Sequence, residues 1–249
     1  MRISHILAAL VVFPLAAAAA TTAGTWTLDS ADEPGRVQFS LQGSRGSGHF
    51  NTSSPWLLAD LRGLDWAGAA KHDVHFTIQR DAGSIDCEGF AQDQHGSGLF
   101  TFKSNPQYAA EMAKLGFSFE EKQLLSATLF DVSFDFARAI QNAAVRGLDA
   151  HKLFAFRIHG VTPEFIRDLR AAGLEAADAD KLIAFRIHGV SPEFAGEISH
   201  LGYPQAPPEQ LIALRIHGVT PQYIEGLRSK GMQNLTLDQL ISLRIHGID

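Results

Sequence analysis

Cysteine, positive charge and long apolar runs are all scarce in this sequence. Cys87 is the only cysteine among 249 residues, so no internal disulfide can form. The 21 lysines and arginines are outnumbered by 27 aspartates and glutamates, and the formal charge of −6 removes the basic excess that nucleic-acid binding requires. No apolar run reaches the roughly 20 residues of a membrane-spanning helix. Packing alone must therefore stabilise the fold, and we expect no nucleic-acid partner.

The common catalytic and cofactor motifs are also missing. The sequence contains no His-Glu-x-x-His, Gly-x-Ser-x-Gly, Gly-x-x-x-x-Gly-Lys or Cys-x-x-Cys. Gly43, Gly46 and Gly48 lie between strand-like runs, without the following helix that a phosphate-binding loop needs. We therefore expect a protein that is not an enzyme, with no cofactor and with no catalytic or metal-binding residues.

The first 23 residues are typical of a cleaved export signal. Arg2 supplies a positive start, residues 6–15 are an apolar run interrupted by Pro14, and the small residues at 16–23 offer cleavage sites. We expect a periplasmic or secreted protein that does not insert into the membrane after cleavage.

Residues 24–104 alternate between apolar and polar side chains, which predicts strands. Val37, Phe39 and Leu41 are separated by polar residues, and breaks rich in Gly, Ser and Asp divide this run from similar runs at 74–78 and 100–102. Short alternating runs of this kind are typical of an antiparallel sheet with one buried face. We expect five or six strands, with residues 56–64 as an irregular or short helical connection.

Residues 105–249 show helical periodicity instead, and they repeat themselves. The tetrapeptide Arg-Ile-His-Gly occurs four times at a constant spacing of 29 residues, beginning at Arg157, Arg186, Arg215 and Arg244. Fainter copies extend the register back to Asn105. A fixed period marks stacked supersecondary units. The predicted fold class is α+β, with an antiparallel sheet domain at 24–104 followed by a solenoid-like array of about five helix pairs at 105–249.

Each repeat carries the start and stop signals of two helices. Thr162 is a predicted N-cap with Pro163 at the first helical position, and Gly173 can close the helix in a left-handed conformation. The second helix begins near Asp178 and ends at Gly189. Because this helix is apolar nearly all round, we expect it to be buried between its partners. We also expect the last such helix to leave an apolar end through which two copies can pair.

The Arg and His residues of the tetrapeptide form two repeated columns. Equivalent positions in stacked helices lie about 8 to 10 Å apart, which is too far for one metal ion to bind several imidazoles. A cation or hydrogen-bond donor at a helix C-terminus interacts favourably with the free carbonyl groups. We interpret both columns as structural repeat positions, namely Arg157, His159, Arg186, His188, Arg215, His217, Arg244 and His246.

Positions that vary between otherwise matching repeats are candidates for a partner surface, because a constant frame with variable side chains can set specificity. These positions fall on the first helix of each repeat, and the candidates are Arg167, Asp168, Arg170, Glu197, Glu225 and Arg228.

A second group of chemistry-bearing residues lies in the sheet domain: His72, Asp73, His75, Cys87 and His95. His72 and His75 are three residues apart in a strand, so their side chains face opposite sides and cannot chelate one ion together. Cys87 lies in an alternating run and is expected in the core.

The repeat motif Val-Thr-Pro-Glu-Phe-Ile at 161–166, and Gly-Ser-Gly-Leu-Phe-Thr-Phe at 96–102 followed by Asn-Pro-Gln-Tyr at 105–108, carry a family resemblance. The chain resembles a group of bacterial envelope proteins in which a sheet domain precedes helical repeats of about 29 residues. A similar tail follows some sensor metallopeptidases of the beta-lactamase antirepressor type. The resemblance covers nearly all of the mature chain and implies a fold and an envelope location, but no activity. The chain lacks the membrane helices and zinc motif of the peptidase fusions.

These features predict a non-enzymatic exported binding module that presents its helical repeats to a protein or peptide in the bacterial envelope. One alternative is a sensor or inhibitor of an envelope peptidase or signalling receptor. A less favoured alternative is a small-ligand protein or enzyme that uses the sheet domain.

Overall fold

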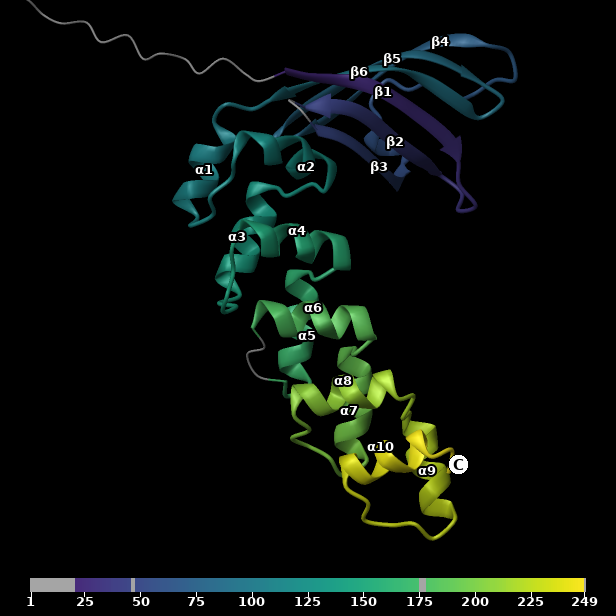
Figure 1. Ribbon diagram of the computed structural model, residues 1–249, viewed down its shortest axis with the longest axis vertical. Helices are drawn as coiled ribbons and strands as arrows, with labels where there is room; N and C mark the ends of the chain where they lie inside the picture. Colours follow the sequence, from purple (N-terminus) through teal and green to yellow (C-terminus); the bar gives the residue numbers. More distant parts are fainter. Residues whose placement is uncertain (1–20, 46–47, 175–177, 249) are drawn as a thin grey trace, which may run out of the picture.

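The computed structural model describes residues 21–45, 48–174 and 178–248, and it confirms the predicted α+β fold class (Figure 1). A sheet lies at one end of the molecule, and helices lead away from it along the long axis to the C-terminus. The expected signal segment lies outside the described residues up to residue 20, and residues 21–23 begin the first strand. No helix in the described ranges has both the length and the apolar character needed to cross a membrane.

The sheet contains six antiparallel strands in the order β3-β2-β1-β6-β5-β4. Two three-stranded meanders therefore meet where β1 pairs with β6. Alternation decides which face is buried: Val37, Phe39 and Leu41 are all buried, whereas Gln38 and Ser40 between them are partly exposed. The strands are β1 (Thr21–Ser30), β2 (Arg36–Arg45), β3 (Gly48–Leu57), β4 (His72–Arg80), β5 (Gly83–Gln92) and β6 (His95–Ser104).

The sheet is strongly curled around an aromatic core. Two strands separate Trp26 on β1 from Phe76 on β4, so a flat sheet would place them about 14 Å apart. Their ring centroids are only 5.1 Å apart, and those of Phe39 and Phe76 are 6.1 Å apart. Glycine permits close backbone approach where β5 and β6 pair, because a Cβ on Gly98 would collide with the Glu88 carbonyl oxygen.

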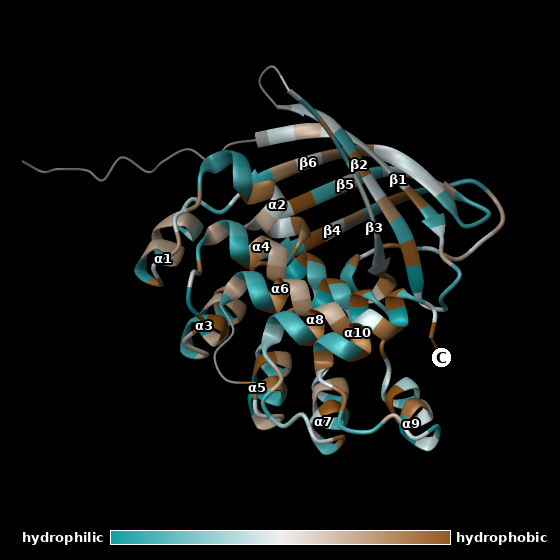
Figure 2. Cartoon of the chain, turned by 60° about the horizontal axis from the view of Figure 1, so that its bottom comes forward, coloured by the Kyte–Doolittle hydropathy of each residue, from teal (hydrophilic) through white to brown (hydrophobic). Residues whose placement is uncertain are grey.

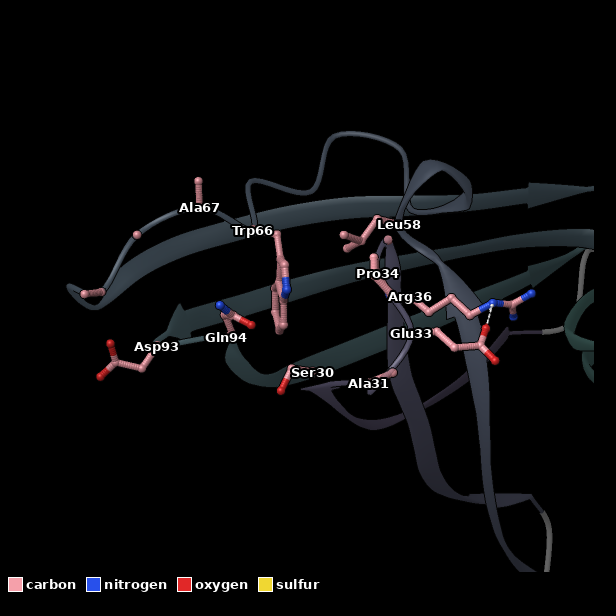
Figure 3. A pocket seen from close by; sticks show the side chains of 13 residues that line it. Ser30, Ala31, Glu33, Pro34, Arg36, Leu58, Trp66, Ala67, Asp93 and Gln94 are labelled. Carbon is pink, nitrogen blue, oxygen red and sulfur yellow. Dashed lines mark ion pairs between the residues drawn. The ribbon is translucent and has the colours of Figure 1, made fainter.

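The connection between β3 and β4 closes part of the opening that this curl leaves. It begins with a short 3-10 helix, η1 (Leu58–Asp60), and Leu61 is buried immediately after it. Arg62 then forms a two-residue bridge with Thr77 at the free edge of β4. The connection continues over the end of the sheet, where Trp66 stands in a cavity (Figure 3).

The helices form two rows. We call α4, α6, α8 and α10 the even row, because each contacts the next, and α1, α3, α5, α7 and α9 the odd row for the same reason. Figure 2 shows the two rows side by side. The bounds are α1 (Tyr108–Lys114), α2 (Leu124–Leu129), α3 (Phe134–Asn142), α4 (Ala150–His159), α5 (Pro163–Ala171), α6 (Ala179–His188), α7 (Pro192–His200), α8 (Pro208–Ile216), α9 (Pro221–Ser229) and α10 (Leu237–Ile245), with a 3-10 turn η2 (Glu121–Gln123) before α2.

The start and stop signals read from the sequence are confirmed. The Thr162 hydroxyl accepts a hydrogen bond from the Phe165 amide at 3.2 Å, and the Asp178 carboxylate accepts one from the Lys181 amide at 2.9 Å. Gly160, the residue after α4, has a φ of +70°, the left-handed conformation of a glycine C-cap.

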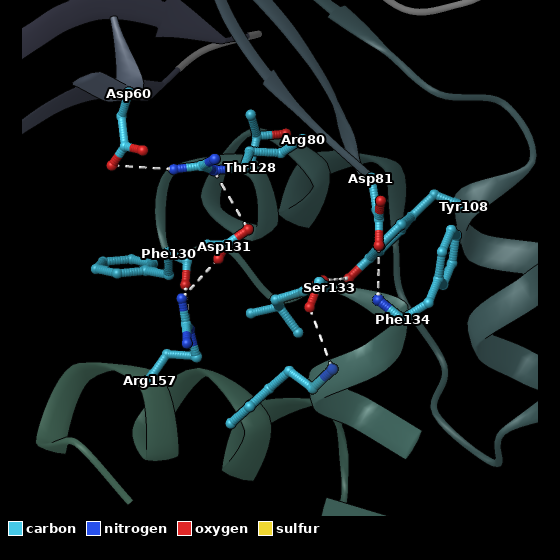
Figure 4. Close-up of polar contacts among 12 residues, drawn as sticks. Asp60, Arg80, Asp81, Tyr108, Thr128, Phe130, Asp131, Ser133, Phe134 and Arg157 are labelled. Carbon is cyan, nitrogen blue, oxygen red and sulfur yellow. Dashed lines mark hydrogen bonds and ion pairs between the residues drawn. The ribbon is translucent and has the colours of Figure 1, made fainter. Parts of the chain in front are cut away.

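One aspartate, Asp131, joins the sheet to the helices. It follows α2, the helix that packs against β5 and β6, and it adopts a φ of +51°. Its carboxylate pairs with Arg80 of β4 at 3.3 Å and with Arg157 of α4 at 2.8 Å (Figure 4). In the 29-residue register Asp131 occupies the place of Gly160, so the first helix pair adapts the repeat to hold the sheet.

A second set of contacts at this junction fixes α3. The Asp81 carboxylate, just after β4, accepts a hydrogen bond from the Phe134 amide at 2.7 Å. The Tyr108 hydroxyl donates to the Val132 carbonyl at 2.6 Å, and burial raises the pKa of Tyr108.

Candidate protein-interaction surface

The largest departure from the sequence-based expectation is an exposed row of isoleucines on the even row of helices. Ile158, Ile187, Ile216 and Ile245 are 54%, 55%, 55% and 58% exposed. The prediction that these helices are buried all round is therefore wrong. In α6 only Leu182 and Phe185 of the long apolar side chains are fully buried. We call the four residues the isoleucine row.

Helix geometry explains this exposure. At 100° per residue, Leu182 and Phe185 mark one side of α6, and Ile187 lies nearly opposite the midpoint between them. Ile183 and Ala184, on the flanks of that exposed side, are only partly buried. The same slots recur every 29 residues, so the exposed side of each helix is apolar along the whole row.

The arginine that precedes each isoleucine ties one repeat to the one before it. The Arg186 Nε donates to the His159 carbonyl at 3.2 Å, and its guanidinium lies 4.7 Å from the centroid of the Phe165 ring. Arg157 makes the equivalent contact with the Phe130 carbonyl at 2.8 Å. Arg215 and Arg244 lie 5.0 and 4.9 Å from the rings of Phe194 and Tyr223.

The glycine of the motif is required by the same contact. A Cβ on Gly160 would lie 2.7 Å from the Arg186 Nη2, and one on Gly189 would lie 2.9 Å from the Arg215 Nη2. Glycine therefore supplies both the left-handed turn and the space for the incoming arginine. Arginine and glycine thus serve the frame, whereas the isoleucine between them faces outward.

The histidine column lies exposed at the same helix ends. His159, His188, His217 and His246 are all exposed, and the His246 Nδ1 lies 2.7 Å from the Ser242 carbonyl oxygen. Within the described ranges no cluster of three or more His, Cys, Asp or Glu side chains could hold a metal ion.

A ladder of ion pairs links the opposite, N-terminal ends of the even row. Lys152 pairs with Asp180, and the Lys181 Nζ lies 2.7 Å from the Glu209 Oε1. These contacts raise the pKa of both lysines and lower the pKa of Glu209. The carboxylates of this face are therefore paired within it, whereas the histidines beside the isoleucine row remain exposed.

The predicted partner surface on the odd row is only partly available. Arg167, Asp168, Glu197 and Glu225 are exposed, and Arg167 pairs with Asp168 at 3.0 Å. Arg170 and Arg228 are instead half-buried and donate hydrogen bonds to the carbonyls of Ala143 and Leu201 on the preceding odd helix segment. These two arginines are therefore structural, which corrects their assignment to the surface.

The candidate residues of the sheet domain do not meet at one place. Cys87 is fully buried in the core, and desolvation raises the pKa of its thiol, which makes it a poor nucleophile. His95 pairs with Asp29 at 2.8 Å on the surface, and the His72 ring contacts the carbonyls of Ala70 and Asp65. Asp73 and His75 are exposed on β4.

No protein-family model and no curated protein matches this chain. The resemblance to envelope proteins with helical repeats therefore stays a prediction.

Proposed function

We propose that this protein is a non-enzymatic exported binding module that uses the isoleucine row to bind an apolar, acidic segment of another protein in the bacterial envelope. The observation that carries the proposal is the repeated exposure of Ile158, Ile187, Ile216 and Ile245, each more than half accessible at the same slot of successive repeats. Apolar side chains gathered on one exposed face are typical of an interaction site.

The apolar character of the partner follows from the chemistry of the row. Nothing in the frame needs these isoleucines, because Leu182 and Phe185 supply the packing of α6. Neighbouring helices in contact lie roughly 8 to 10 Å apart, so the isoleucines offer apolar contacts at about that interval. An extended segment crossing the row can place one apolar side chain on each helix.

The acidic character of the partner follows from the flanking residues. On a helix surface the arginine and histidine adjacent to each isoleucine lie on either side of it, as Arg186 and His188 flank Ile187. Arg186 and Arg215 are exposed although they also contact the preceding repeat. Carboxylates of a partner would complement these cationic groups and the histidine column.

Photocrosslinking in the native cell envelope tests the proposal. A photoreactive phenylalanine analogue replaces Ala184, on the isoleucine side of α6, and in a matched control it replaces Glu197, on the exposed side of α7. We expect residue 184 to capture a protein through a segment that mass spectrometry maps as acidic and apolar. The double substitution Ile187→Glu and Ile216→Glu should abolish this capture without changing the circular dichroism spectrum.

Three results would contradict the proposal. Equal capture from residue 197 would place the surface on the odd row. Capture that persists in the Ile187→Glu, Ile216→Glu variant would show that the isoleucines are not the contact. A crosslink to a second copy of the chain would mean that the row pairs with itself.

A further inference from the structure

We propose that the cavity at the open end of the curled sheet is a binding site for a neutral oligosaccharide, with the Trp66 ring as its stacking surface. The cavity has a volume of about 530 Å³, within the range of small-molecule sites. Its walls are the β1–β2 turn, the β5–β6 turn and the connection between β3 and β4. The mouth of a curled or closed sheet is a common position for such sites.

Trp66 is placed for stacking rather than for the core. The chain has three tryptophans, and the other two, Trp26 and Trp56, are 1% and 7% exposed. Trp66 is only half-buried, and its ring stands in the cavity between Gln94 on one side and Leu58 with Pro34 on the other (Figure 3). A partly exposed indole face in a cavity presents a flat apolar surface that suits the C–H face of a sugar ring.

The loop that carries Trp66 is held in place at both ends. The His72 ring lies 3.0 Å from the Ala70 carbonyl oxygen and 3.2 Å from that of Asp65. Only the imidazolium form can donate to both oxygens, and these contacts raise the pKa of His72. The Asp65 carboxylate also accepts a hydrogen bond from the Ala67 amide at 3.1 Å. The ring is therefore presented on a loop that needs little ordering when a ligand binds.

The polar lining favours hydroxyl groups over ions. Arg36 is the only cation among the residues that line the cavity, and it is already paired with Glu33 at 2.8 Å. An anionic ligand would therefore find no free partner charge. The carboxylate of Asp93, the amide of Gln94 and the hydroxyl of Ser30 offer acceptors and donors to a polyol.

A neighbouring hollow favours a chain of sugars over a single one. It has a volume of about 330 Å³, and Asp93 lines both it and the Trp66 cavity. A second aromatic side chain, Phe90, lines this hollow and is 40% exposed, with the Lys71 Nζ 3.9 Å from its ring centroid. Two aromatic rings on either side of a shared carboxylate can contact successive sugar units.

Titration of the full-length mature protein with defined probes tests this site. The probes are chitotetraose, cellotetraose and maltotetraose, with choline and inorganic phosphate as the cationic and anionic alternatives. Binding is followed by intrinsic tryptophan fluorescence, which Trp66 should dominate because Trp26 and Trp56 are buried, and by calorimetry. We expect saturable binding of at least one tetrasaccharide and none of choline or phosphate.

Variants separate the site from the rest of the molecule. Trp66→Ala should abolish saccharide binding, Trp66→Phe should retain part of it, and Gln94→Ala should weaken it at least tenfold. The Ile187→Glu, Ile216→Glu variant should bind saccharide like the wild type, so this test can fail without affecting the proposed function. Binding of choline or phosphate in place of sugars, binding that survives Trp66→Ala, or no saccharide binding at all would overturn the assignment.

Discussion

The odd and even rows of helices are built on the same frame but treat their apolar residues differently. In α5 of the odd row, Phe165, Ile166 and Leu169 are all buried. In α6 of the even row, Leu182 and Phe185 are buried, but Ile187 is 55% exposed. Arginine from either row reaches back to a carbonyl of the preceding repeat, as Arg186 and Arg170 both do. One row therefore completes the core, and the other both completes it and displays apolar side chains.

The largest effect should come from truncating the shared core. Phe185 on the even row is fully buried, so Phe185→Ala should cost about 3 to 5 kcal/mol of unfolding free energy, since it leaves a cavity. Phe165→Ala on the odd row should cost a similar amount. Chemical denaturation of both variants measures this, and a loss below about 1 kcal/mol at Phe185 would mean that the even row is not packed as described.

Glycines at the helix ends should separate the two rows. Gly160 ends an even helix with a φ of +70°, and Gly173 ends an odd helix with a φ of +84° and has open space around its Cβ position. Alanine at either position incurs left-handed strain of roughly 1 to 2 kcal/mol. At Gly160 the new Cβ also displaces Arg186, which should add roughly 1 kcal/mol. Equal losses in thermal unfolding would show that the arginine contact is unimportant.

Helix caps should have equal effects in both rows, which makes them a control for the glycine comparison. Thr162→Ala removes the cap of α5, and Asp178→Ala removes the cap of α6. Each should lower the unfolding free energy by about 1 kcal/mol, because one amide at the helix start loses its acceptor. A much larger loss at only one of the two would show that the rows are not supported alike.

The smallest effect concerns pH, where similar shifts have different causes in the two rows. The pKa of Glu193 on α7 is lowered by its own backbone amide and by the Ser191 hydroxyl, whereas that of Glu209 on α8 is lowered chiefly by Lys181. Lys181→Met should therefore raise the pKa of Glu209 and leave that of Glu193 unchanged in a carboxyl NMR titration. Because both pKa values are lowered on folding, their stabilisation is present above the unfolded pKa and is lost as the pH falls through the folded value. A Glu209 pKa that stays low in the variant would exclude Lys181 as the cause.

Local signals predicted much of the fold. Thr162 and Asp178 cap helices and Gly160 and Gly189 end them because these residues act on amides and φ angles within their own turn. Alternation likewise placed Cys87 in the core of the sheet. Such features depend on neighbours a few residues away and can therefore be seen in the sequence.

Features that depend on distant partners could not be predicted in this way. Arg170 varies between repeats like a surface residue, and only the stacking of α5 on α3 brings it to the Ala143 carbonyl. The Trp66 cavity arises from the curl of the sheet, which brings three separate connections together. The isoleucine row was detectable, because the angle between Ile187 and the pair Leu182 and Phe185 follows from the helical period. The high apolar content of these helices concealed it.

The unfolding free energy of a variant with serine at all four positions of the isoleucine row tests the central claim most directly. Serine and isoleucine have similar helix propensities, so the change reports mainly on burial. Because Ile158, Ile187, Ile216 and Ile245 are more than half exposed, we expect the variant to unfold within about 2 kcal/mol of the wild type in a denaturant titration. A loss on the order of 8 kcal/mol or more, as four buried isoleucines would give, would contradict the assignment of the row as a displayed surface.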